Sequence, residues 1–311
     1  MLSLFFKKVL LLILPFVGIL WYLEQKLTQM PNTYNQKKKH LEAGVDSIDL
    51  LVLGSSQAFY GINPDFLKPY KGFNLAGSSQ PFFFDKAFVD AYLPRLPKLK
   101  KVLISVSYFS FWYDTEDGTE AWRDYYYYQF WDFRKAHVQP FHKKAASKIL
   151  LYSPRTAYKR WWEDFQIPEK DLPTPNGWYK VRLDAPVWWE VSDKGGEGRV
   201  REHEKIMRPE RLAYNKALLD SILSKLQQRG VEAILITPPV LPFYHKYQTP
   251  ALEAKNLEII RTFQQKYGIR YFDYSRDARF ERGEFRDNDH LNYLGAEKFS
   301  QFIAQEVLVN L

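Results

Sequence analysis

Residues 48–58 read IDLLVLGSSQA, a short apolar run that ends abruptly in one glycine and two serines. A run of this length, bounded by turn residues, is typical of a strand that is buried on both faces of a parallel sheet. Four further segments are strand candidates, at residues 72–75, 102–106, 231–236 and 270–272. We therefore expect five strands, with the first one running into a serine turn.

Segments with a helical spacing of apolar residues follow these strands, at residues 82–93, 209–229, 251–267 and 293–309. The second of them ends at Gly230, a helix stop, and leads straight into the fourth strand. Short strands that alternate with amphipathic helices form a parallel sheet that is covered on both faces. The predicted fold class is α/β, a three-layer sandwich with a central parallel sheet.

One long stretch departs from this alternation. Residues 108–189 lie between the third strand and the next clear helix, and they hold eight of the nine tryptophans and the run YYYY at 125–128. We interpret residues 47–311 as one α/β domain that carries an aromatic-rich insertion at about 108–205.

The N-terminus carries an apolar segment, VLLLILPFVGILWYL at residues 9–23, preceded by Lys7 and Lys8. Counted from Leu2, it has 22 residues and would span about 33 Å as a helix, against a hydrocarbon core of ~30 Å. We interpret residues 1–24 as a membrane anchor or signal segment and residues 25–46 as a linker. A small-x-small cleavage site is missing, which favours an uncleaved anchor over a cleaved signal peptide or a buried helix. The two lysines predict a cytoplasmic N-terminus and an extracytoplasmic domain, periplasmic or on the cell surface, although 37–39 are lysines as well.

The overall composition is 46% hydrophobic and 26% charged, which excludes a disordered chain and a multi-span membrane protein. The chain has no cysteine, so thiolate nucleophiles, disulfides and cysteine-bound metals are excluded. Its 44 basic and 36 acidic residues give a net charge of +8, which favours anionic surroundings such as a membrane surface or an acidic glycan. The sequence contains no nucleic-acid recognition motif, and we expect no nucleic-acid partner.

Two places in the sequence are suited to chemistry. Serines directly after a buried strand lie at the carboxyl edge of the sheet, where open α/β sheets bind ligands. His290 lies in FRDNDHLNYLGA at residues 285–296, just before the last predicted helix. Asp287 can fold back in a turn and fix the imidazole tautomer, as the third member of a catalytic triad does. Two other readings stay open: Ser56 alone could cap a helix, and the Asp287, Asp289 and His290 cluster could be a structural turn or a metal site.

The motif Asp-x-Asp-His-Leu-Asn-x-x-Gly-Ala before a final helix resembles the last conserved block of the SGNH (GDSL-like) hydrolases, whose fold is flavodoxin-like. The turn at 54–56 resembles their first block, with Ser55 in place of the usual Asp. The resemblance implies Ser56 as nucleophile, His290 as base and Asp287 as its orienting partner, without a metal or another cofactor. The chain also resembles membrane-anchored members of this superfamily that work on cell-surface polymers.

The remaining blocks of that superfamily supply the oxyanion hole. Residues 73–77, FNLAG, fit the second block, so the resemblance implies the amides of Ser56 and Gly77 as oxyanion donors and places Asn74 against the substrate. The third block should follow the third strand with Gly-x-Asn, but residues 105–110 read SVSYFS. One oxyanion donor is therefore unassigned. An α/β-hydrolase, suggested by Gly-x-Ser-x-Ala at 54–58, is disfavoured because in that fold several strands precede the nucleophile.

The insertion suggests a substrate. Between residues 131 and 162 it has eight basic residues and one acid, and the aromatic rings of Trp161, Trp162, Trp188 and Trp189 could stack on sugars. An aromatic core with a solvated basic face, or packing at a membrane interface, would explain the same composition. We expect Ser-His-Asp acyl transfer on an ester of a cell-envelope polysaccharide, by an O-acyltransferase or esterase, with an anionic or acylated glycan substrate and a membrane protein as acyl donor. The alternative is a non-catalytic SGNH-like glycan-binding or scaffold protein.

Overall fold

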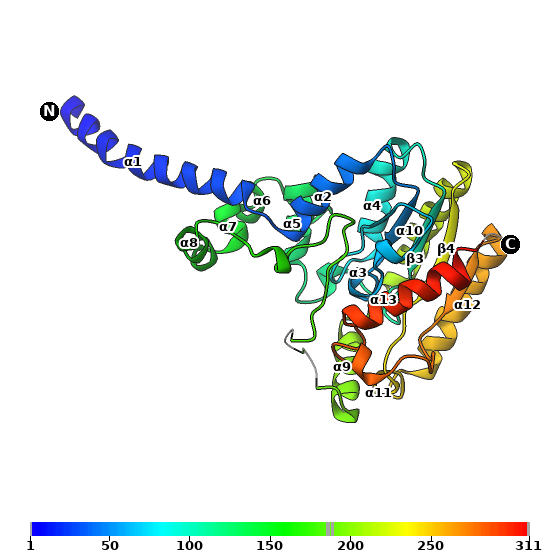
Figure 1. The fold of residues 1–311 in the computed structure, drawn as a ribbon. Coiled ribbons are helices and arrows are strands. Elements are labelled where there is room, and N and C mark those ends of the chain that lie inside the picture. Colours follow the sequence, from blue (N-terminus) through cyan, green and yellow to red (C-terminus); the bar gives the residue numbers. More distant parts are fainter. Residues whose placement is uncertain (1, 185–186, 188–189, 310–311) are drawn as a thin grey trace. The chain divides into compact units, whose positions relative to one another are not determined.

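The computed structural model describes residues 2–184, 187 and 190–309 and divides the chain into two compact units (Figure 1). The first unit consists of Met1–Gln36 and Trp122–Leu172. The second unit consists of Lys37–Ala121 and Pro173–Leu311 and contains the sheet.

The sheet has five parallel strands in the order β2-β1-β3-β4-β5. Their bounds are β1 Leu50–Leu53, β2 Gly72–Asn74, β3 Lys101–Ser105, β4 Glu232–Thr237 and β5 Arg270–Asp273. All five predicted strands are confirmed, and their ends shift by at most two residues from the expected positions. The predicted fold class is likewise confirmed.

Two layers of helices cover the sheet. On one side α4 (Phe82–Tyr92) contacts α10 (Arg211–Gln228), which in turn contacts α12 (Pro250–Tyr267). On the other side α3 (Ser56–Gly61) packs against α13 (Tyr293–Phe302), which continues as a π-helix over Ile303–Val307. Short 3-10 helices cover Pro64–Phe66, Leu93–Arg95, Thr115–Asp117 and Arg282–Glu284.

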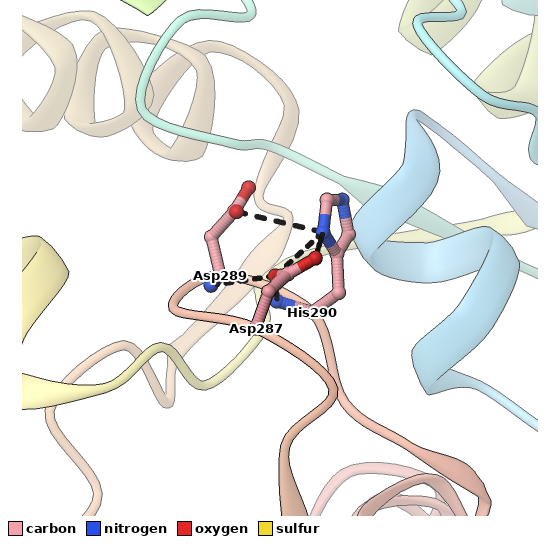
Figure 2. A group of neighbouring side chains, drawn as sticks. All are labelled: Asp287, Asp289 and His290. Carbon is pink, nitrogen blue, oxygen red and sulfur yellow. Dashed lines mark hydrogen bonds and ion pairs between the residues drawn. The ribbon is translucent and has the colours of Figure 1, made fainter. Parts of the chain in front are cut away.

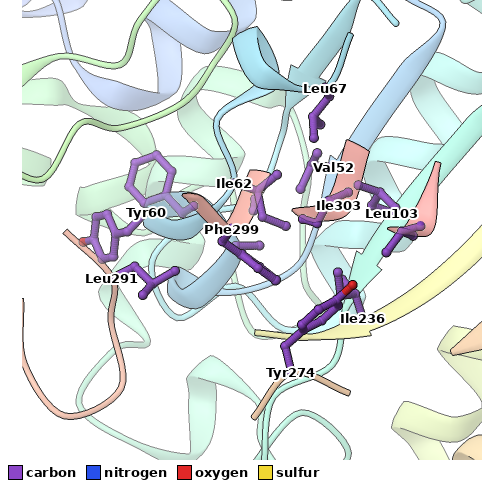
Figure 3. Close-up of a cluster of buried hydrophobic side chains, with 14 of the residues drawn as sticks. Val52, Tyr60, Ile62, Leu67, Leu103, Ile236, Tyr274, Leu291, Phe299 and Ile303 are labelled. Carbon is purple, nitrogen blue, oxygen red and sulfur yellow. The ribbon is translucent and has the colours of Figure 1, made fainter. Parts of the chain in front are cut away.

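The core under α13 shows why the strands read as continuous apolar runs. Val52, Leu103 and Ile236 project from three neighbouring strands toward Phe299 and Ile303 (Figure 3). All five side chains are fully buried. Because alternate strand residues point to opposite faces, the residues between them face the α4, α10 and α12 layer, and both faces need apolar side chains.

One helix of the second unit comes from the end of the predicted insertion and packs against another helix of that unit. Helix α9 (Asp193–Ile206) packs against α11 (Pro242–His245). Of the predicted insertion at 108–205, residues 122–172 lie in the first unit, and 108–121 and 173–205 lie in the second. Contacts explain the difference, since Arg208 donates to the carbonyl of Trp112, and Asn256 to that of Tyr108.

The first unit is helical. It contains α1 (Leu2–Gln29), α5 (Trp122–Trp131), α6 (Lys143–Ala146), α7 (Lys148–Tyr152), α8 (Pro154–Trp162) and a 3-10 helix at Glu169–Asp171. Residues 7–29 of α1 are long and apolar enough to cross a membrane. The end of α1 contacts α7 and α8, and Leu27 of α1 is buried together with Ala157 and with Met30, which follows the helix.

The segment predicted as a linker is mostly helical. Helix α2 (Thr33–Gly44) fills most of residues 25–46. The side chain of Asn32 accepts hydrogen bonds from the amides of Tyr34 and Asn35 and so caps the start of the helix. Lys37 and Leu41, one turn apart, are buried. The polar composition hid this helix, because a buried lysine counts as polar in a sequence pattern.

Candidate active site

The candidate site lies where the order of the strands reverses. The chain passes from β1 to β2 on one side and then places β3 on the other side of β1. Loops that leave the carboxyl ends of such strands diverge and form a crevice. Here the two loops are the serine turn at 54–56 and the segment that begins at Val106.

Gly54 starts the turn with φ of +126°, a value that side chains other than glycine rarely adopt. A Cβ at this position would lie 2.6 Å from the Cβ of Ser105 on β3. The amide of Gly54 donates to the carboxyl of Asp85, which is buried and also accepts from Gln80 at 2.6 Å. Burial raises the pKa of Asp85 to about 7, against these two hydrogen bonds, which lower it.

Ser55 and Ser107 connect the two loops. Their hydroxyl oxygens lie 3.0 Å apart, and Ser107 also donates to the side-chain oxygen of Gln57 at 2.8 Å. A hydroxyl has one proton, so Ser55 is the donor in the first of these bonds. Ser107 lies in the segment after β3, where Gly-x-Asn was expected. Through these two hydrogen bonds it helps to fix the start of α3.

Ser56 and His290, 234 residues apart in sequence, are brought into contact. The hydroxyl oxygen of Ser56 lies 2.8 Å from Nε2 of His290. Ser56 is the first residue of α3, and His290 lies in the loop before α13. The exposed fraction is 8% for Ser56 and 0% for His290, so the pair is almost completely enclosed.

Asp287 holds the other ring nitrogen. Its two carboxylate oxygens lie 2.9 and 3.0 Å from Nδ1 of His290 (Figure 2). The amides of Asp289 and His290 also donate to Asp287, which closes the turn between them. Burial would raise the pKa of Asp287, but its electrostatic interaction and hydrogen bond with His290 and the charge of Arg199 outweigh burial and lower this pKa to about 2. A carboxylate here requires a proton on Nδ1 and leaves Nε2 free to accept from Ser56.

A second carboxylate lies close to the same imidazole. Oδ1 of Asp289 lies 3.4 Å from Nδ1 of His290 and 2.8 Å from Nε of Arg199 on α9. The three side chains Asp287, Asp289 and His290 are close enough to hold a metal ion. The guanidinium of Arg199 already neutralises Asp289, so the donor set fits an oriented imidazole better than a cation.

Of the two predicted oxyanion donors, one is engaged in another hydrogen bond. The amide of Gly77 donates to the carbonyl of Gly54 at 3.1 Å, so the prediction for Gly77 is wrong in this conformation. Ser56 opens α3, whose first hydrogen bonds run from Ala58 and Phe59 to the carbonyl of Ser55. Its amide therefore lies among the unpaired first donors that any helix presents, as an oxyanion donor should.

The residues predicted to bind substrate fall into three groups. Asn74 is fully buried and bonds to the backbone of Ala58, Ile62 and Ala76, so its predicted substrate contact is wrong. It closes the loop after β2 instead. Trp161 and Trp162 are exposed on α8 in the first unit, with exposed fractions of 51% and 84%. The other two predicted residues, Trp188 and Trp189, lie outside the described residues.

Sequence reasoning missed three contributors to the site: Asp85, Ser107 and Arg199. Asp85 lies on an amphipathic helix and Arg199 in a glycine-rich stretch, where nothing in the spacing indicates a role. Ser107 occupies a position that the superfamily pattern would have marked, had its residue been Asn. A cavity of about 310 Å³ lies at the ends of β3, β4 and β5, and Ser107, Thr237 and Asp273 are among its lining residues.

No family model matches the chain, and no curated protein is similar to it in sequence. Solved structures do resemble it. A GDSL-like lipase from Bacteroides thetaiotaomicron is 11% identical, with a TM-score of 0.41 over 89% of this chain and 100% of its own. A protein described as an acylhydrolase from Bacteroides fragilis is 10% identical, with a TM-score of 0.40 over 91% and 98%.

A third structure, from Streptococcus pneumoniae and described as a platelet activating factor, is 11% identical, with a TM-score of 0.42 over 95% of this chain and 97% of its own. The lipase and the acylhydrolase bear names from the group of hydrolases that the sequence blocks resemble. With TM-scores below 0.5, these likenesses add nothing to the chemical argument, which rests on Ser56, His290 and Asp287 in this chain.

Proposed function

We propose that this chain is a serine enzyme that transfers acyl groups. The observation that carries the proposal is the 2.8 Å contact between Ser56 and Nε2 of His290, with Asp287 on the opposite nitrogen. A serine hydroxyl is a weak nucleophile until a base removes its proton, and the base needs a third group to hold its tautomer. The nucleophile, the base and the orienting carboxylate are all present, and the imidazole lies between the other two groups.

The reaction has two steps. Nε2 of His290 takes the proton of Ser56 as the serine oxygen bonds to the ester carbonyl carbon, and the negative oxygen faces the amide of Ser56. The tetrahedral adduct then breaks its bond to the leaving alcohol, which receives the proton from His290. An acceptor hydroxyl, of water or of a sugar, repeats the sequence in reverse and frees Ser56.

The enclosure of the pair supports transfer to a bound acceptor over hydrolysis. Water must be kept from an acyl-serine for a sugar hydroxyl to compete with it. His290 is fully buried and Ser56 is 8% exposed.

The proposed substrate is an O-acylated polysaccharide of the cell envelope, with the enzyme anchored in the membrane and the sheet unit outside the cytoplasm. The apolar helix α1 and the net charge of +8 support this location and an anionic glycan. A membrane acyl-donor protein would supply the acyl group. These assignments extend the proposal beyond the chemistry of the triad.

A fluorophosphonate probe tests the chemistry, because it labels only an activated serine. We expect the full chain in detergent to be labelled on Ser56, as mapped by mass spectrometry, and S56A to be unlabelled. Ser79→Ala is the matched control, since residues 77–79 also read Gly-Ser-Ser. A folded wild-type chain that resists labelling would contradict the enzyme proposal. It would favour the glycan-binding alternative, which the engaged Gly77 amide supports.

A further inference from the structure

We propose that α8 and the segment before it form a second membrane contact, which lies on the bilayer surface beside the span. The surface consists of Tyr158, Trp161 and Trp162 on α8, with Phe141 and Leu150 from the preceding residues, and is called the aromatic foot here. These side chains are 63%, 51%, 84%, 98% and 41% exposed, respectively. The occupant that fits it is the interfacial zone of a bilayer that contains anionic lipid.

Helix α1 changes from an exposed helix to a packed one near Leu23. Its apolar side chains from Leu10 to Tyr22 are about half exposed or more, whereas Leu27 and Met30 are buried in the first unit. A helix from residue 2 to residue 22 is about 31 Å long, close to the ~30 Å hydrocarbon core. The packed part begins at Leu23, one residue later. The helix therefore passes from bilayer to folded unit without a linker.

Hydrogen bonds and apolar packing hold the end of α1 to the rest of the first unit. Glu24, at the start of the packed part, accepts hydrogen bonds from the hydroxyl of Ser147 at 2.9 Å and from the amide of Lys148 at 2.5 Å. Ala157 of α8 is buried against the same end of α1. Figure 1 shows α8 on the side of this unit from which the free part of α1 extends. The foot is thereby held close to the level where the apolar span ends.

The residue types on α8 suit the surface of a bilayer. On α8 the residues Ala157, Tyr158, Trp161 and Trp162 follow the helical period and form one face, and Arg155 and Lys159 lie beside it. Tryptophan and tyrosine favour the headgroup level of a bilayer, and nearby cations favour anionic lipid. Lys143 and Lys144 add charge in the preceding segment. This arrangement matches a lipid surface better than a glycan, because the aromatic face is continuous with the packing of α1.

The test uses the absence of cysteine from the chain, which allows single labelling sites without removing a native thiol. Tyr158→Cys and Leu12→Cys are each labelled with a polarity-sensitive fluorophore in the full chain. The proteins are reconstituted into vesicles of phosphatidylcholine and phosphatidylglycerol, and quenching by lipid-borne spin labels is compared with quenching by aqueous iodide. We expect lipid quenching to exceed iodide quenching severalfold at both sites.

Substitutions then test whether the tryptophans hold the foot on the lipid. In the Tyr158→Cys background, W161S/W162S should cause a severalfold loss of lipid quenching. The matched pair E169S/K170S, also exposed and in the same unit, should leave the quenching unchanged.

The proposal requires α1 to span the bilayer but does not depend on catalysis at Ser56. A label at 158 that iodide reaches freely, while the label at 12 is quenched by lipid, would overturn the foot and leave the span. A label at 12 that lipid does not quench would overturn both. Neither result bears on the fluorophosphonate experiment.

Discussion

Two carboxylates lie near Nδ1 of His290, but their partners differ. Asp287 lies 2.9 Å from this nitrogen, whereas Asp289 lies 3.4 Å away and is paired with Arg199. We expect Asp287→Asn to slow fluorophosphonate labelling by roughly 10²–10⁴-fold, because the amide can favour the wrong tautomer. The loss should be smaller than for His290→Ala. Equal labelling rates in D287N and wild type would contradict the orienting role.

We expect Asp289 to stabilise the fold through its ion pair with Arg199, and not to orient His290. Asp289→Asn leaves the guanidinium of Arg199, which is 18% exposed, without its carboxylate. We expect a loss of about 2–4 kcal/mol in the free energy of unfolding, with labelling reduced by less than about tenfold. Chemical denaturation of the full chain in detergent measures the first, and probe kinetics the second. The double variant R199M/D289N should regain part of the stability; a further loss would contradict the pairing.

Asp85 predicts a pH dependence. Its pKa of about 7 lies above its ordinary value of 3.8, so the folded chain holds this proton more tightly than the unfolded chain. The contribution of Asp85 to stability is then present at low pH and is lost as the pH rises through the window between these values. D85N keeps an oxygen for the amide of Gly54 but does not ionise. Between pH 5 and 8, wild type should lose about 2–3 kcal/mol relative to D85N in denaturant titrations. A difference that does not change with pH would contradict the assignment.

At the scale of elements, α9 depends on close backbone contact. A Cβ on Gly196 would lie 2.2 Å from the carbonyl oxygen of Phe243 in α11, and Gly195 is similarly confined. Gly196→Ala should push α9 from α11 and move Arg199 away from Asp289. We expect a loss of about 3 kcal/mol or more in the free energy of unfolding. Gly283→Ala is the control, since its Cβ would meet open space, and it should have little effect. Similar stabilities for both variants would contradict the close contact.

The elements of the sheet could be predicted from the sequence, and those around it only in part. Apolar runs such as 50–53 have one structural solution in an α/β chain, a buried parallel strand. Helix α9 begins Asp193-Lys-Gly-Gly, a sequence with low helix propensity that does not predict a helix. These two glycines allow close backbone packing instead. Residues 122–172 form one unit with residues 1–36, in which α1 contacts α7 and α8, and no local sequence pattern contains such contacts.

The site was predictable where chemistry fixes the residue types. Ser56, Asp287 and His290 were predicted from the resemblance of two separate sequence blocks to known hydrolases, and the structure brings their side chains together. The engaged amide of Gly77 and the structural role of Asn74 depend on hydrogen bonds between loops, and a sequence shows residue types but not which amide is already paired.

At the scale of the whole molecule, the chain should be oriented by its first lysines. We expect protease added to sealed spheroplasts to digest residues beyond about 30 and to spare an N-terminal tag, because Lys7 and Lys8 favour the cytoplasmic side. Immunoblotting of the tag measures the protected fragment, and a cytoplasmic marker enzyme checks that the spheroplasts are sealed. Full protection of the chain in sealed spheroplasts would contradict this orientation.

The enclosure of Ser56 and His290 has a kinetic consequence. A buried catalytic pair can react only during the fraction of time that the protein exposes it. The apparent affinity for any reactant is reduced by that fraction. The observed rate with a small probe should then stop rising at high probe concentration and approach the opening frequency of the protein. A reactant whose binding stabilises the open form would escape that ceiling. If the chain is such an enzyme, its preference among reactants is set by how strongly each one stabilises the open form, before any bond to Ser56 is made.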